Sequence, residues 1–175
     1  MTELEERLAL KWFGLDAKTI DPNTHAWIVG EAPGKNTRSY LPMFPYPRTS
    51  SGGRLLQLSG LTPAEYFTIQ RRNLIEEYPG IWPKFEAKKQ AQNILEDMPR
   101  GSRVVLLGRR VGEAFGFTQY FQHETHAGSV YAILPHPSGL NRELNDERVK
   151  AAIRMAMHWV AGYTIETARS RLSGS

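Results

Sequence analysis

The 175-residue chain contains no cysteine. This absence excludes disulfides, cysteine-ligated zinc, iron–sulfur clusters and thiol catalysis. The chain also lacks an apolar run approaching the roughly 18 residues of a membrane span, and its acidic N-terminus is atypical of a signal peptide. We therefore expect a cytoplasmic protein without membrane contact. We also expect a monomer that uses no metal and no organic cofactor.

No repeat, low-complexity block or domain linker interrupts the sequence. Hydrophobic residues make up 41% and charged residues 23%, which is the composition of an ordinary soluble protein. A chain of this length suits one domain and is too short for two ordinary ones. We expect a single domain over residues 1–168, followed by a disordered tail at residues 169–175.

Positive charge is modest overall but unevenly distributed. The net charge is +4, yet residues 32–75 hold six basic side chains and one acidic one. Residues 103–142 hold four arginines and two glutamates. A polyanion such as DNA would bind these segments if they share a face. The alternative is that the charges are scattered and solvated.

Candidate strands alternate with candidate helices along the chain. The apolar, β-branched runs that predict strands are His25–Val29, Tyr66–Arg72, Arg103–Leu107 and Ser129–Leu134. Helical spacing or start signals predict helices at 2–13, 54–61, after Thr62, 83–97, from 111 to 115, and 145–161. This alternation predicts an α/β fold with a central four-stranded, mainly parallel sheet flanked by helices.

Loops beyond the carboxyl ends of such strands usually carry the chemistry. Residues 34–53 are rich in Gly, Pro, Ser and Tyr and read as one long loop, which in a compact domain is functional or disordered. The polar residues His123–His126 lack the spacing of a metal-binding helix, so we expect a turn there.

Two of these loops carry motifs. Gly30–Gly34 reads GEAPG and His136–Arg142 reads HPSGLNR, and each motif follows a candidate strand. Together, about 100 residues apart, they resemble the uracil-DNA glycosylase superfamily, with a first motif similar to that of its family 4. Supporting segments are SGGRLL at 51–56, NLIEEYP at 73–79 and RVVLLG at 103–108. The resemblance covers residues 25–160 and implies a three-layer glycosylase-like fold.

The activity implied is that of a monofunctional DNA glycosylase. Such an enzyme flips a uracil or modified pyrimidine out of single- or double-stranded DNA and hydrolyses its N-glycosidic bond, leaving an abasic site. Two alternatives stay open: a catalytically silent protein of this fold that binds DNA or a nucleobase, and a glycosylase specific for a 5-substituted base. Family 4 members carry four cysteines for an iron–sulfur cluster, and this chain has none.

The resemblance assigns the chemistry to His136 and Glu31. His136 would donate a hydrogen bond to O2 of the departing base, where negative charge builds. Glu31 would orient the water or stabilise the cationic sugar carbon. The alternatives are structural: a lone histidine can cap a turn before a proline, and a glutamate can form a salt bridge or cap the turn at Gly34.

The base pocket would be formed by the first motif, Asn73 and one aromatic ring. The Asn73 amide can pair with N3–H and O4 of uracil, or it can simply terminate a strand. Phe44 and Tyr46 are candidates to stack on the base, with Phe44 preferred, unless they form a small hydrophobic cluster under the loop. Gly30 and Ala32 would also border the base.

DNA contacts would come mainly from the second motif. Leu140 would be the wedge that fills the hole left by the flipped nucleotide, or it would pack onto the core. Ser138 and Arg142 would hold flanking phosphates, although Arg142 could equally be a solvated charge. Further candidate DNA contacts are Ser51, Lys35, Asn141 and Arg109, the last together with its neighbour Arg110.

Overall fold

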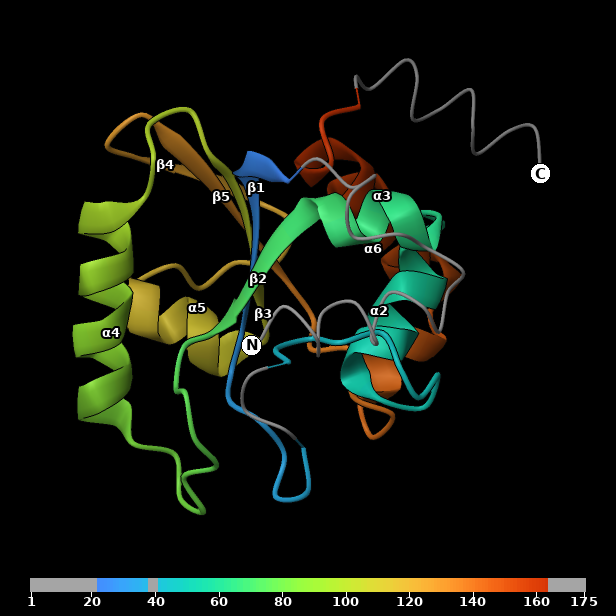
Figure 1. Ribbon diagram of the computed structural model, residues 1–175, viewed down its shortest axis with the longest axis horizontal. Helices are drawn as coiled ribbons and strands as arrows, with labels where there is room; N and C mark the ends of the chain where they lie inside the picture. The colour runs from blue at the N-terminus through green and yellow to red at the C-terminus, as the bar shows by residue number, and fades with distance from the viewer. Residues whose placement is uncertain (1–21, 38–40, 164–175) are drawn as a thin grey trace.

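The computed structural model describes residues 22–37 and 41–163 (Figure 1). The helix expected at residues 2–13 and the tail expected at 169–175 lie outside these ranges. Within them, no helix has the length and apolar character needed to cross a membrane.

A five-stranded sheet forms the centre of the molecule, in the order β2-β1-β3-β5-β4. The strands are β1 (Asn23–Gly30), β2 (Ile69–Asn73), β3 (Arg103–Leu107), β4 (His123–His126) and β5 (Ser129–Leu134). Four of them run parallel, and β4 is antiparallel to β5 at one edge. The predicted α/β fold with a mainly parallel sheet is confirmed, with five strands in place of four.

The fifth strand, β4, occupies the segment for which we expected a turn. Ala127 and Gly128 adopt positive φ angles of 48° and 81°, and they reverse the chain so that β4 pairs with β5. All four β4 residues are exposed, so the strand lacks the apolar alternation that would have marked it in the sequence. The turn therefore lies after His126, and the preceding residues form an edge strand.

The second predicted strand begins too early. Thr62 and Glu65 form a reciprocal capping box, as the sequence indicates, and the helix α3 (Pro63–Thr68) that it starts includes Tyr66. The strand β2 begins only at Ile69. The local hydrogen bonds of the cap thus prevail over the β propensity of the aromatic residues that follow.

Helices cover both faces of the sheet (Figure 1). One face carries α2 (Ser51–Ser59), α3 and α6 (Glu147–Val160), and the other carries α4 (Lys84–Asp97) and α5 (Arg109–Phe115). Each layer encloses its own apolar core, with Leu55, Tyr66 and Ile153 on the α2 side. Ala91 and Val111 belong to the core on the α4 side. The molecule is a three-layer sandwich in which both faces of the parallel strands are buried.

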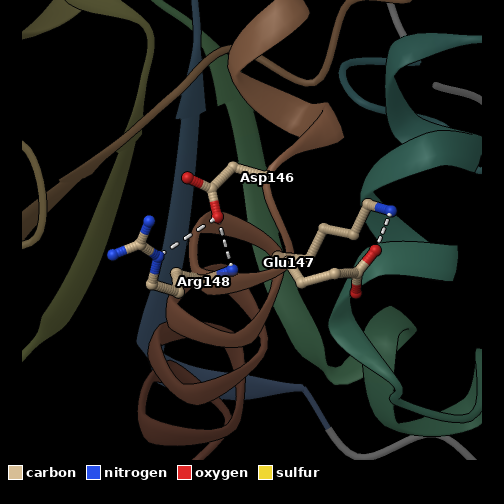
Figure 2. Close-up of polar contacts among 4 residues, drawn as sticks. Asp146, Glu147 and Arg148 are labelled. Atoms are coloured by element: carbon tan, nitrogen blue, oxygen red, sulfur yellow. Dashed lines mark hydrogen bonds and ion pairs between the residues drawn. The ribbon is translucent and has the colours of Figure 1, made fainter.

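The start of α6 is fixed by Asp146 (Figure 2). Its Oδ1 accepts a hydrogen bond from the Arg148 backbone N–H at 2.8 Å, and the Arg148 Nε lies 3.7 Å from the same oxygen. Lys150 pairs with Glu147 at 2.7 Å in the next turn. A short 3-10 helix, Arg142–Asn145, links the second motif to this cap. The motif loop therefore ends at a well-defined helix start.

The parallel strands all end at one edge of the sheet, the lower edge in Figure 1. Gly30 pairs with Asn73 at the ends of β1 and β2, and Leu107 pairs with Leu134 at the ends of β3 and β5. The loops that follow these residues include both motifs. The topology thus brings together segments that lie about 100 residues apart in the sequence.

Candidate active site

A cavity of about 870 Å³ opens at the carboxyl edge of the sheet. The loops following β1, β2 and β5 contribute to its walls, together with the first turns of α2 and α5. The candidate site residues among its lining are Glu31, Ala32, Phe44, Tyr46, Ser51, Asn73, His136 and Ser138. The structure therefore gathers both candidate catalytic residues, the Asn73 amide and both candidate aromatic rings around one space.

The imidazole of His136 is held in a defined tautomer. The Ser138 backbone N–H donates a hydrogen bond to His136 Nδ1 at 3.2 Å, so Nδ1 is an acceptor and the ring proton lies on Nε2. Burial lowers the pKa of His136, an effect that Arg110 reinforces and Glu31 opposes. The ring is therefore neutral at pH 7. The turn contact expected of a lone histidine is present, and it leaves Nε2–H as a donor.

We expect the His136 ring to titrate below the usual 6.5 of a histidine. The unfolded chain binds a proton at this site as the pH falls through 6.5, whereas the folded protein resists protonation. This residue therefore adds stability above pH 6.5 that is lost as the pH falls towards the folded-state pKa. NMR titration of the imidazole resonances measures this directly; a His136 midpoint at or above the ordinary 6.5 of a histidine would contradict the assignment.

Glu31 lies beside His136, over a glycine. A Cβ at Gly108 would lie 3.0 Å from Glu31 Oε1 and 3.2 Å from His136 Cβ. Gly108 also has a φ of 95°, a conformation that other residues rarely adopt. The end of β3 thus leaves room for the carboxylate and the imidazole to approach each other.

Arg110 forms an ion pair with Glu31. Its Nη1 lies 3.7 Å from Glu31 Oε2, and its guanidinium stands 5.8 Å from the centroid of the Trp82 ring. The salt bridge considered as an alternative role for Glu31 is therefore present. This ion pair is long, and the Arg110 side chain is 60% exposed, so the Glu31 carboxylate stays available to the cavity.

Asn73 closes the pocket at the ends of β1 and β2. A Cβ at Gly30 would lie 2.8 Å from Asn73 Oδ1, so the amide sits directly over the backbone of Gly30. The pairing of the two strands continues past them, because the Leu74 N–H donates to the Gly30 carbonyl at 2.8 Å. Gly30 itself is buried beneath the amide and does not line the cavity.

The predicted loop at 34–53 is irregular at residues 34–37 and 41–50, whereas residues 51–53 belong to α2. Its segment 41–50 is held by several hydrogen bonds. The Tyr66 hydroxyl donates to the Met43 carbonyl at 2.9 Å, and the Ser50 hydroxyl donates to the Phe44 carbonyl at 3.2 Å. A Cβ at Gly52 would lie 2.3 Å from both of these carbonyl oxygens. The loop therefore rests on the first turn of α2 without any gap.

The two candidate stacking rings differ in their surroundings. Phe44 is half-buried and packs against Phe67, with centroids 6.0 Å apart and planes tilted by 55°. Tyr46 is 46% exposed. Both line the cavity, and Phe44 also belongs to a small aromatic cluster, as its alternative reading expected.

The second-motif loop projects Leu140 into solvent. Leu140 is 93% exposed, so the expectation that it might pack onto the core is wrong. Asn141 holds the loop instead of facing the cavity, because its Nδ2 donates to the His136 carbonyl at 3.0 Å and its Oδ1 accepts from the Glu143 N–H. Arg142 is exposed beside it.

The remaining candidates lie outside the cavity lining. Lys35 is exposed on the first-motif loop. Arg109 is turned to the Tyr120 hydroxyl, whose pKa is raised by burial and by Glu143. Its neighbour Arg110, named with it as a candidate DNA contact, lines the cavity.

The lining residues that the sequence interpretation did not assign to a base pocket include two aromatic rings and one cation: Tyr78, Trp82 and Arg110. The sequence shows two adjacent arginines, Arg109 and Arg110, after the glycine that follows β3. It does not show which of the two faces the cavity. Tyr78 and Trp82 follow Asn73 in an aromatic, proline-rich segment, and this composition next to a candidate base reader could have indicated them. Another cation, Arg54, packs its guanidinium against Gly139 of the second motif.

Comparison with known proteins assigns the chain to no family. No model of a known protein family matches it. No curated protein matches it either. A functional conclusion therefore depends on the geometry of the cavity and on the motifs themselves.

Proposed function

We propose that the protein is a monofunctional DNA glycosylase that hydrolyses the N-glycosidic bond of a uracil or modified pyrimidine flipped into the cavity. The observation that carries this proposal is the neutral His136 ring, whose Nδ1 accepts from the Ser138 N–H and whose Nε2–H stays free to donate. A neutral donor suits an oxygen that becomes negative as the reaction proceeds.

The reaction requires charge stabilisation on both sides of one bond. When the bond between C1′ and N1 breaks, its electron pair leaves with the base, and negative charge accumulates on O2. His136 Nε2–H donates a hydrogen bond to that oxygen. The Glu31 carboxylate stabilises the positive charge on C1′ and orients the water that attacks it, and the proton released passes to solvent or to the departing base.

Recognition of the base falls to Asn73 and an aromatic ring. The amide offers an acceptor to N3–H and a donor to O4, a pattern that suits uracil and opposes cytosine. The cavity of about 870 Å³ has room beyond one pyrimidine, and Ala32 and Gly34 on its wall are small. These features favour tolerance of substituents at C5 of the base.

Several basic side chains support DNA as the partner. Lys35, Arg48 and Arg142 are exposed on loops at the carboxyl edge, and Arg110 is exposed at the cavity wall. Segments that are basic in sequence thus meet on one side of the fold, which favours a polyanion. No step involves an iron–sulfur cluster, because the chain has no cysteine to ligate one.

A base-release assay tests the proposal. The protein is incubated with oligonucleotides containing deoxyuridine, 5-substituted pyrimidines or mismatched bases, in single strands and duplexes, and alkali then cleaves any abasic site. We expect strand breaks with at least one of these substrates. DNA binding without abasic product on any of them would favour the catalytically silent alternative.

Changing Asn73 to Asp should lower release of uracil by about tenfold or more, because the carboxylate cannot donate to O4 and repels it. The measurement is kcat/KM for the best substrate of the panel. Asn145→Asp, which introduces the same charge on an exposed residue away from the cavity, is the matched control. Equal losses in both variants would show that Asn73 does not read the base.

A further inference from the structure

Exposed hydrophobic side chains gather around the mouth of the cavity. The large, exposed hydrophobic residues of the described chain are Tyr46, Tyr78, Ile81, Phe85, Phe121 and Leu140. Tyr46 and Tyr78 line the cavity, and Ile81 and Leu140 are each adjacent in sequence to lining residues. Ile81 is 86% exposed and Leu140 is 93% exposed. Exposed apolar groups concentrated at one place commonly mark an interaction site.

Ile81 and Leu140 occupy similar positions in unrelated loops. Each directly follows a glycine that lines the cavity, Gly80 in one loop and Gly139 in the other. Each backbone N–H is held within its own turn: Ile81 N–H donates to the Pro79 carbonyl at 2.7 Å, and Leu140 N–H donates to the Ser138 hydroxyl at 3.3 Å. Both turns thus present an aliphatic side chain to solvent on a fixed backbone.

The sheet order separates the two loops. The Ile81 loop follows β2 and the Leu140 loop follows β5, with β1 and β3 between these strands. Three strand spacings correspond to roughly 14 Å. Both loops lie at the carboxyl edge of the sheet (Figure 1). Ile81 and Leu140 therefore belong to loops that start from strands on different sides of β1 and β3.

The backbone under Ile81 is anchored. Trp82 is half-buried and packs against the core on the α4 side. The Arg110 guanidinium stacks over its ring. The neighbouring acidic residues Glu76 and Glu77 are exposed and would repel phosphates. This segment is therefore suited to apolar contact with bases and poorly suited to contact with the DNA backbone.

We propose that Ile81 is a second side chain that contacts the base stack, on the side of the flipped nucleotide opposite to Leu140. This inference rests on the proposed function, since it assumes a nucleotide turned into the cavity between the two loops. Leu140 supports the stack at one side of the gap, and Ile81 packs against the bases on the other. Two apolar contacts would hold the flanking bases apart while the base is bound.

Binding to an abasic-site analogue tests this without requiring catalysis or knowledge of the target base. The probe is a duplex with one tetrahydrofuran residue and 2-aminopurine at its 5′ or 3′ side, whose fluorescence rises when it is unstacked. Ile81→Ser should weaken binding about tenfold and reduce the fluorescence rise on one side. Leu140→Ser should reduce it on the other side.

Two further variants control for the loss of hydrophobicity. Ile81→Leu should keep nearly all the binding and the fluorescence response. Phe85→Ser removes a side chain that is equally exposed, at 85%, but is not adjacent to any lining residue, and it should change binding less than twofold. Equal behaviour of Ile81→Ser and Phe85→Ser, or no binding of the probe by the unaltered protein, would overturn the role of Ile81.

The outcome also separates the two proposals. Binding and unstacking of the probe that depend on Ile81, without base release from any substrate, would refute the glycosylase and retain the second contact. Base release with Ile81→Ser indistinguishable from the unaltered protein in binding and fluorescence would refute only the second contact.

Discussion

Replacing His136 with alanine is expected to lower kcat for base release by about two to three orders of magnitude. A hydrogen-bond donor aimed at an oxygen that becomes negative typically contributes about 3–4 kcal/mol to stabilising the transition state. The donor here is a neutral ring whose tautomer is fixed by the Ser138 N–H, so little reorganisation is needed during the reaction. KM should change much less than kcat, because the interaction strengthens only as the bond breaks.

The matched control is His123→Ala, which removes an exposed histidine that stacks on Trp159 instead of lining the cavity. Its kcat should stay within about twofold of the unaltered protein. Far-ultraviolet circular dichroism should show that both variants fold. An unchanged kcat for His136→Ala would remove this residue from the mechanism.

Gly52→Ala should destabilise the protein and abolish most of its activity. In a helix, this change normally stabilises by up to about 1 kcal/mol. Here the new Cβ would lie 2.3 Å from the carbonyl oxygens of Met43 and Phe44, which belong to the backbone of a pinned loop and cannot rotate away. We expect a net loss of about 3 kcal/mol, which corresponds to a fall in Tm of about 6–12 °C.

The loss of activity follows because Phe44 lines the cavity and must move with its backbone. Thermal unfolding and kcat/KM are measured on the same preparation, below the lowered Tm. Gln57→Ala, on an exposed position of the same helix, is the control and should leave both within experimental scatter. An unchanged or raised Tm for Gly52→Ala would mean that the loop does not rest on α2.

The sequence predicted buried strands far better than exposed ones. Arg103–Leu107 and Ser129–Leu134 were predicted with the bounds that the structure has, because a parallel strand buried on both faces is a continuous apolar run. The edge strand His123–His126 has no buried face and therefore no apolar pattern. Its pairing is set by the turn at Ala127 and Gly128, a feature of backbone conformation that propensities at β4 do not reveal.

For the candidate site, the motifs predicted which loops meet but not which side chains face inward. Glu31, Asn73 and His136 line one cavity because each lies at, or within two residues of, the carboxyl end of a parallel strand. Arg109 and Arg110 are chemically alike and adjacent, so the sequence does not indicate that Arg110 pairs with Glu31 while Arg109 contacts Tyr120. The sequence does not identify Trp82 as a cavity residue, because its contact with Arg110 joins two segments that lie far apart along the chain.

The residues that line the cavity extend from Glu31 to Gly139, a span that begins directly after β1 and includes the other four strands of the described sheet. No proteolytic fragment that lacks either end of this span can retain the binding site. When denaturant is added, the rate of base release should therefore fall in the same cooperative transition in which the secondary structure is lost. The assay for base release would thus also measure the fraction of molecules that are folded.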